Sequence, residues 1–242
     1  MAVRCAECPL RKLEIFLPFS AEELRFMERF KVGELNIDAG MTLLLEGSNS
    51  PQLYTALEGL GLRYKLLEDG RRQVLNFIFP GDLIGLQAGI MGEMGHSVEA
   101  TSRMTLCVFD RGEIWTVFKS YPERSFDMTW LAACEEHFLG ESLTSVGQRT
   151  AIQAVSWALV RLYERGKSLG LTRNGNMALP YRQQDLADAL GLSLVHTNKT
   201  LARLRERQLA TWSDGELHIP NLDQLAEIAV TETESQRRRP LL

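Results

Sequence analysis

The 242-residue chain lacks the features that mark secreted and membrane proteins. It has only four cysteines, Cys5, Cys8, Cys107 and Cys134, which is too few and too scattered for the disulfide framework of a small secreted domain. No apolar run approaches the length of a membrane span, and charges interrupt the first 16 residues too often for a signal peptide. We therefore expect a cytoplasmic protein.

The sequence also lacks the residue patterns of common catalytic sites. It shows no Ser/His/Asp arrangement at recognisable spacing, no phosphate-binding loop, no HExxH zinc pair and no carboxylates grouped near a histidine. There is no internal repeat and no low-complexity segment. These absences argue against an enzyme, and no catalytic residue is predicted.

Charge is divided unevenly along the chain, whose net charge is −4. Residues 1–147 carry 14 Lys and Arg against 21 Asp and Glu, whereas residues 148–242 carry 13 against 10. A weakly basic half does not identify a nucleic-acid binder by itself. However, five of its cations lie within residues 182–207, and this concentration indicates where an acidic polymer would bind.

The pattern of residues 180–219 is typical of a helix-turn-helix followed by a small β-hairpin. Apolar residues repeat at helical spacing up to Leu190, Gly191 supplies the tight turn, and Ser193 can cap a second helix. Two short apolar runs then flank an Asp-Gly turn at residues 214–215, as in the wing of a winged helix. The alternative is that these hairpins serve only packing.

The second helix, from about Leu194 to Arg207, is the predicted reader of base pairs. Thr197, Leu201 and Leu204 fall on one face and should point into the domain. The side chains predicted to contact DNA are Arg182, Ser193, Val195, His196, Asn198, Lys199, Arg203 and Arg205. Asn can bond adenine through two hydrogen bonds, Lys can donate to guanine, Val can contact a thymine methyl group, and the arginines suit phosphates.

From about Phe16 to Trp115, short apolar runs are punctuated by glycine every eight to twelve residues, which is typical of a compact all-β unit. The strand candidates are residues 41–45, 52–57, 61–67, 73–79 and 104–109. Residues 150–169 then show the apolar spacing of a helix that opens the C-terminal domain.

Residues 123–147 predict a helix roughly 37 Å long. Its apolar positions are Leu131, Cys134, Phe138, Leu139, Leu143 and Val146. They form more apolar surface than one small β domain is expected to cover, so we predict that the helix pairs with its copy in a homodimer. The alternative is a connecting helix that is buried against its own domain.

This order of parts resembles the CRP/FNR family of bacterial transcription regulators over nearly the whole chain. The segments that carry the resemblance are Gly40 to Gly47, Leu53-Tyr54, Pro80 to Gly85 and Leu190 to Ser193. The resemblance implies an α+β fold with an N-terminal double-stranded β-helix (a jelly-roll-like β-roll), a long dimerisation helix and a C-terminal winged helix-turn-helix. We assign these three parts to residues 1–122, 123–147 and 148–230, and expect residues 231–242 to be a disordered tail.

The family resemblance also implies a homodimer on double-stranded DNA, with two-fold related half-sites roughly 34 Å apart. RNA polymerase would be a further partner if the protein is an activator. Well-known branches of the family carry Glu at the position of Val195 and Arg at that of Lys199. The operator should therefore differ from either standard consensus.

The resemblance argues against cyclic AMP as the ligand. Family members that bind it carry a Glu and an Arg-Ser pair for the ribose and phosphate, and here those places hold Leu86 and His96-Ser97. Each lost charged hydrogen bond costs on the order of 1.5–3 kcal/mol. His96 is an alternative haem ligand, since some family members bind haem near this position.

Cys5, Cys8 and Cys107 resemble three ligands of the iron–sulfur cluster in the oxygen-sensing FNR branch, while Glu14 stands where that branch has its remaining cysteine. They are candidate cluster ligands, with Glu14 as the fourth, and would make the regulator redox- or oxygen-responsive. The alternatives are a thiol switch, a zinc site, or cysteines that only pack. In the last case the β-roll would be structural and the regulator controlled by its abundance.

Overall fold

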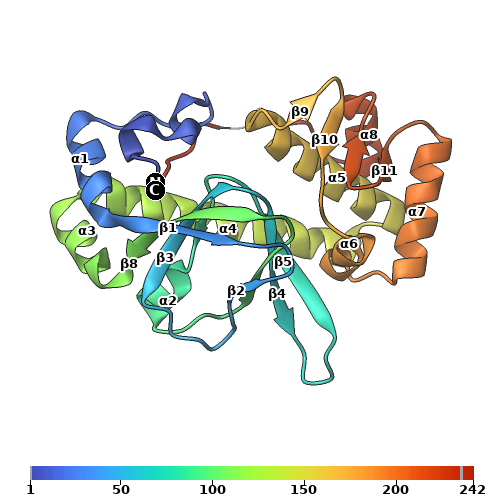
Figure 1. Ribbon diagram of the computed structural model, residues 1–242. Coiled ribbons are helices and arrows are strands. Elements are labelled where there is room, and N and C mark those ends of the chain that lie inside the picture. Colours follow the sequence, from blue (N-terminus) through green and yellow to red (C-terminus); the bar gives the residue numbers. More distant parts are fainter. Residues whose placement is uncertain (1, 235–236) are drawn as a thin grey trace. The chain divides into compact units, whose positions relative to one another are not determined.

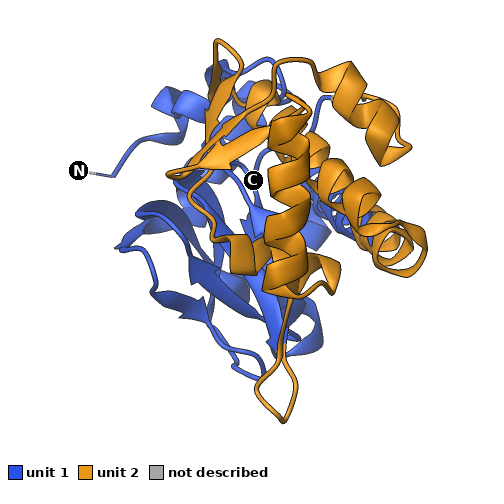
Figure 2. Ribbon diagram, turned by 90° about the vertical axis from the view of Figure 1, so that its right-hand side faces the viewer, with its two compact units in different colours: residues 1–65, 77–136, 238–242 blue, residues 66–76, 137–237 orange. Residues whose placement is uncertain are grey.

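The computed structural model describes residues 2–234 and 237–242, which form two compact units (Figures 1 and 2). Unit 1 comprises the residues up to 65, residues 77–136 and residues 238–242. Unit 2 comprises residues 66–76 and 137–237. None of the helices in this described part is both long and apolar enough to cross a bilayer. The mixture of antiparallel sheets and helices confirms the predicted α+β class.

Two four-stranded sheets form the β-roll. The first sheet is ordered β1 (Lys31–Ile37), β8 (Met104–Asp110), β3 (Gln52–Glu58) and β6 (Leu83–Ile84). The second is ordered β2 (Thr42–Leu44), β7 (Ser97–Ala100), β4 (Gly61–Leu66) and β5 (Arg72–Ile78). A buried apolar cluster takes side chains from both sheets, among them Ala56, Ile78, Val98 and Leu106. The five strand runs read from the sequence are confirmed, with ends shifted by a residue or two.

Helices not predicted from the sequence accompany these strands. They are η1 (Cys5–Glu7), η2 (Pro9–Lys12), α1 (Ala21–Phe30), α2 (Leu86–Met91), η3 (Arg111–Glu113) and α3 (Ile114–Ser120). Helix α1 begins with a capping box, in which Ser20 Oγ accepts from the Glu23 backbone N–H at 3.2 Å and Glu23 accepts from the Ser20 N–H at 2.6 Å. The Ser-x-x-Glu spacing could have revealed α1, whose Phe26, Met27 and Phe30 are buried.

Helix α4 (Pro122–Gln148) is the long helix expected from the sequence. Its first half is covered by its own chain, because Met128 is 1% and Leu131 is 5% exposed. This corrects the expectation that Leu131 lies at a dimer interface. Farther along, Cys134 and Leu139 are exposed, and Leu143 is 74% exposed.

Unit 2 is built around α5 (Ala151–Ser168), which packs against α6, α7 and α8. The other helices are α6 (Gln183–Leu190), α7 (Leu194–Glu206) and α8 (Leu222–Ala229). A four-stranded sheet is ordered β11 (Thr211–Ser213), β12 (Glu216–His218), β10 (Asn176–Ala178) and β9 (Thr172–Arg173). Helix α8 and the β9–β10 hairpin were not predicted from the sequence, although Asn174-Gly175 is a strong hairpin-turn signal. A Cβ at Gly166 would lie 1.9 Å from Met177 Sδ, so the Met177 side chain would have to move to admit any other residue.

The end of the chain differs from the expected disordered tail. Residues 235–236, part of that prediction, lie outside the described residues, but residues 238–242 belong to unit 1. Arg239 forms a parallel bridge with Phe16, and its guanidinium donates to Asp82 Oδ1 at 3.0 Å. Leu241 and Leu242 are 4% and 5% exposed. An apolar end with a backbone partner is ordered because it buries surface and satisfies its hydrogen bonds.

We predict that Arg239→Ala lowers the free energy of unfolding by about 2 kcal/mol, because the Asp82 carboxylate, whose side chain is 3% exposed, loses a charged partner. Urea unfolding followed by circular dichroism measures this change. Arg238→Ala is the matched control, since Arg238 is exposed and has the same charge. Equal stability of the two variants would show that the ion pair does not stabilise unit 1.

Candidate nucleic-acid interface

Helices α6 and α7 form the helix-turn-helix. Gly191 ends α6 with a φ of 65°, a left-handed conformation that favours glycine, and the Leu192 N–H donates to the Ala187 carbonyl at 3.1 Å. Ser193 then caps α7, because its Oγ accepts from the His196 backbone N–H at 3.2 Å. Turn and cap confirm the local structure expected from the sequence.

Helix α7 has one buried and one exposed side. Thr197, Leu201 and Leu204 are 0%, 8% and 0% exposed, as expected. Thr200 is also buried and donates from Oγ1 to the His196 carbonyl at 2.9 Å, which the apolar pattern did not reveal. The exposed side chains expected to meet DNA are Val195, His196, Asn198, Lys199, Arg203 and Arg205.

The predicted wing is present as the hairpin β11–β12. Asp214 and Gly215 both have positive φ, 53° and 73°, as a two-residue hairpin turn requires. Trp212 is buried and donates from its indole N–H to the Leu179 carbonyl at 3.3 Å. Half-buried His218 pairs with Asn176 at 2.8 Å. The wing is therefore anchored to the body of unit 2.

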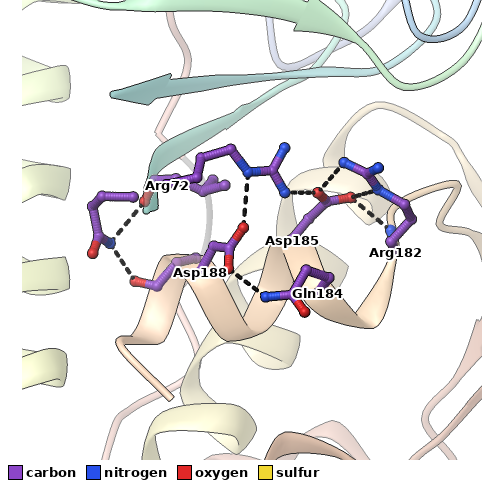
Figure 3. A network of polar contacts seen from close by, with 8 residues as sticks. Arg72, Arg182, Gln184, Asp185 and Asp188 are labelled. Carbon is purple, nitrogen blue, oxygen red and sulfur yellow. Dashed lines mark hydrogen bonds and ion pairs between the residues drawn. The ribbon is translucent and has the colours of Figure 1, made fainter. Parts of the chain in front are cut away.

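Arg182, another predicted DNA contact, lies at the N-cap of α6 in a network of charges (Figure 3). Its Nη2 donates to Asp185 Oδ1 at 2.8 Å, and its backbone N–H donates to Asp185 Oδ2 at 2.8 Å. Arg72 donates to Asp185 and, from Nε, to Asp188 at 2.8 Å. Burial raises the pKa of Asp185, but hydrogen bonds from Arg182 and Arg72 outweigh burial and hold it below its usual range. Asp185 is thus a carboxylate between two guanidinium groups.

Two family models match this chain. The Crp-like helix-turn-helix domain matches residues 153–228, and the cyclic nucleotide-binding domain matches residues 34–121. The transcriptional activatory protein AadR of Rhodopseudomonas palustris is 31% identical over 72% of this chain and 72% of its own length. The chain belongs to the CRP/FNR family. It is a DNA-binding transcription regulator and not an enzyme.

Other relatives place this CRP/FNR protein in the FNR-like branch. The nitrogen fixation regulation protein FixK of Bradyrhizobium diazoefficiens is 29% identical over 83% of each chain. The solved structure of FixK2 from Bradyrhizobium japonicum has a TM-score of 0.74 and 23% identity, with 84% of this chain and 98% of that chain covered. The likeness to FixK2 shows the shared fold.

The three cysteines that resemble FNR cluster ligands lie within unit 1. Cys5 begins η1, Cys8 follows it, and Cys107 is buried in β8 opposite Glu34 of β1. Burial raises the pKa of the Cys107 thiol to about 11 and also raises that of Cys5, although Lys31 acts in the opposite sense on both. These two thiols are therefore protonated at neutral pH.

The ammonium group of Lys31 interacts with two of these cysteines, Cys5 and Cys107. Its Nζ donates to Glu34 and to the Val3 carbonyl, both at 2.7 Å, and hydrogen-bonds Cys107. Burial lowers the pKa of Lys31, but Glu34 and Cys107 outweigh burial and raise it, so it stays an ammonium group. Glu14, the expected fourth ligand, is exposed. Within residues 2–234 and 237–242, no three His, Cys, Asp or Glu side chains are arranged to hold a metal ion. An ammonium group hydrogen-bonded to Cys107 does not fit an iron–sulfur cluster, which normally takes four thiolate ligands.

The β-roll also contains an ion pair, Arg63 with Glu135, that was not predicted from the sequence. Arg63 on β4 is buried, pairs with Glu135 at 2.6 Å and donates to the Leu83 carbonyl at 2.8 Å. Next to it, His96 has its pKa lowered to about 4, first by burial and then by the charge of Arg63. The neutral imidazole is therefore the native form above this pH.

This shift predicts a pH dependence of stability. The folded pKa of His96, about 4, lies below its ordinary value of 6.5, so the unfolded chain binds a proton more readily between these values. The stability that depends on neutral His96 is fully present above pH 6.5. It is lost as the pH falls toward 4, by up to about 1.4 kcal/mol per pH unit. Unfolding of His96→Gln by urea across this range should show a smaller loss than the wild type. A variant at the exposed His137 is the control, and identical curves for wild type and His96→Gln would contradict the prediction.

Proposed function

We propose that the protein binds a palindromic operator as a homodimer and reads base pairs with the exposed side of α7, with phosphate contacts from its flanks. The observation that carries this proposal is the division of α7 into a buried apolar side and an exposed side. Asn198 and Lys199 stand at the centre of the exposed side, and Val195, 65% exposed, lies one turn before them. These groups match adenine, guanine and the thymine methyl group in a major groove.

Homodimerisation is supported by the second half of α4. Leu139, Leu143 and Val146 are 44%, 74% and 45% exposed and follow one another at helical spacings of four and three. An apolar stripe of this kind is stabilised by a partner helix, and a second copy would supply the same stripe. Two copies would present two α7 helices to the half-sites of one operator. If the protein is an activator, RNA polymerase is its further partner.

The surroundings of the cysteines favour a regulator whose β-roll works without an iron–sulfur cluster. Lys31 stays charged and hydrogen-bonds Cys107, so an ammonium group lies next to one of the candidate cluster ligands. This supports control by the amount of protein over an oxygen response that runs through a cluster. A ligand of the β-roll would have to accommodate the charges of Arg63 and Glu135.

The reader assignment predicts different effects for base and phosphate contacts. Lys199→Ala and Asn198→Ala should reduce discrimination between the preferred site and random duplex DNA, with each lost base contact worth about 1–3 kcal/mol. Arg205→Ala should weaken binding to all sequences by a similar factor. Selection from a random DNA library followed by titration of the selected site measures both effects.

Glu227→Ala, at an exposed position of α8, is a control for surface substitution in unit 2. If Asn198→Ala and Lys199→Ala leave base preference unchanged, another surface reads the operator. Sedimentation of the complex counts the chains on one site. A single chain on a palindromic site would contradict the proposed homodimer.

We further predict that the protein purified without oxygen is colourless and holds no stoichiometric iron or sulfide. Its affinity for the selected DNA should be the same before and after exposure to air, because no cluster is lost. Visible absorption spectra, iron and sulfide analysis and DNA titration test this prediction. A brown protein that bleaches in air and loses DNA affinity would restore the cluster hypothesis.

A further inference from the structure

Arg72 contacts two carboxylates of α6 from a segment far away in the sequence. It begins β5, in the hairpin segment 66–76 that belongs to unit 2 although strands β4 and β5 extend from unit 1. Its guanidinium donates through Nη2 to Asp185 and through Nε to Asp188 at 2.8 Å (Figure 3). The neighbouring Gln73 donates to the Ala189 carbonyl at 3.1 Å. The hairpin therefore contacts α6, the first helix of the helix-turn-helix, through ion pairs and a hydrogen bond.

The two carboxylates lie three residues apart, and so on one side of α6. The side chains of Asp185 and Asp188 are 1% and 14% exposed, and that of Arg72 is 15% exposed, so water screens these pairs poorly. Asp188 also accepts from Gln184. Two buried negative charges this close to one another require cationic partners, and Arg72 serves both.

Arg182 shares Asp185 with Arg72 but has a different environment. Its side chain is 64% exposed, at the N-terminal end of a helix whose dipole favours anions. A DNA phosphate at this end would have to compete with Asp185 for the Arg182 guanidinium. While Arg72 compensates Asp185, that competition is weaker and the net charge of the four groups is zero.

We propose that Arg72 is a positioning residue for DNA binding, which neutralises Asp185 and Asp188 so that Arg182 can turn from Asp185 to a DNA phosphate. The inference rests on the proposed function, since it assumes that DNA approaches α6 and α7. Without Arg72, the remaining cation on Asp185 is Arg182, and Asp188 adds an uncompensated charge that repels phosphates.

The full-length Arg72→Ala variant is titrated with the operator selected by the wild type and with a mixed-sequence duplex. We expect affinity for both to fall about tenfold, equivalent to about 1.4 kcal/mol. The slope of log affinity against log salt should decrease by roughly 0.9 for each lost phosphate contact. Arg71→Ala is the matched control, because Arg71 precedes Arg72, has the same charge and has a side chain that is 77% exposed. This control should change the affinity by less than about twofold. Its salt slope should stay within about 0.3 of the wild-type value.

The double variant Arg72→Ala/Asp185→Asn, which also removes the carboxylate that holds Arg182, separates charge compensation from support of the fold. It should recover affinity to within about threefold of the wild type, because the net charge of the network returns to zero. Circular dichroism and thermal unfolding accompany each titration. If Arg72→Ala does not fold, Arg72→Lys replaces it, and a lysine that cannot bridge both carboxylates should lower affinity by about threefold.

Affinity of Arg72→Ala equal to that of Arg71→Ala would overturn the inference. A double variant that binds as weakly as Arg72→Ala would also overturn it, because Arg72 would then act through the fold and not through charge. Lys199→Ala and Arg205→Ala are titrated in parallel. If these two variants bind like the wild type, the proposed function fails, whereas the inference alone fails if they weaken binding and Arg72→Ala does not.

Discussion

The burial of Thr197, Leu201 and Leu204 is the constraint on which the DNA-binding surface depends. These side chains hold α7 against the rest of unit 2, where α7 packs on α5 and α6. A helix with one side held in this way exposes the opposite side in a defined orientation. The Ser193 cap fixes where the helix begins, so the residues near its N-terminus face solvent as a set. DNA recognition requires this rigidity, because a base contact fails when its donor is misplaced.

Pairing of charges over long sequence distances is a second theme of the structure. Arg72 meets Asp185 and Asp188, and Arg239 meets Asp82 from the other end of the chain. Each pair includes a carboxylate that is largely hidden from water, and attraction to the cation offsets part of its desolvation cost. These contacts help to hold two peripheral segments, the 66–76 hairpin and the chain end, where Leu241 and Leu242 also bury apolar surface. Charge pairing therefore acts together with apolar packing at the periphery.

Relation to the FNR-like branch does not by itself transfer the chemistry of a cofactor. The cysteines at familiar positions have a particular environment in this chain, because the ammonium group of Lys31 hydrogen-bonds Cys107. The β-roll is a second example of a site that family membership does not define. Its domain is related to cyclic nucleotide-binding domains, and it contains a charged group formed by Arg63, Glu135 and His96. Family membership identifies DNA as the partner, and the side chains around each site decide the rest.

The sequence alone determined the order of the parts, five strand positions, the long helix, and the turn, cap and inward side of the helix-turn-helix, because these follow from local periodicity and turn chemistry. Helix α1 and the β9–β10 hairpin carry equally local signals, a capping box and Asn174-Gly175, and could have been predicted. Only the tertiary structure decided that Leu131 is buried, that Lys31 rather than Glu14 meets the cysteines, and that Arg72 reaches α6. The physical reason is that burial and charge pairing depend on which distant segments meet, and no local pattern encodes that meeting.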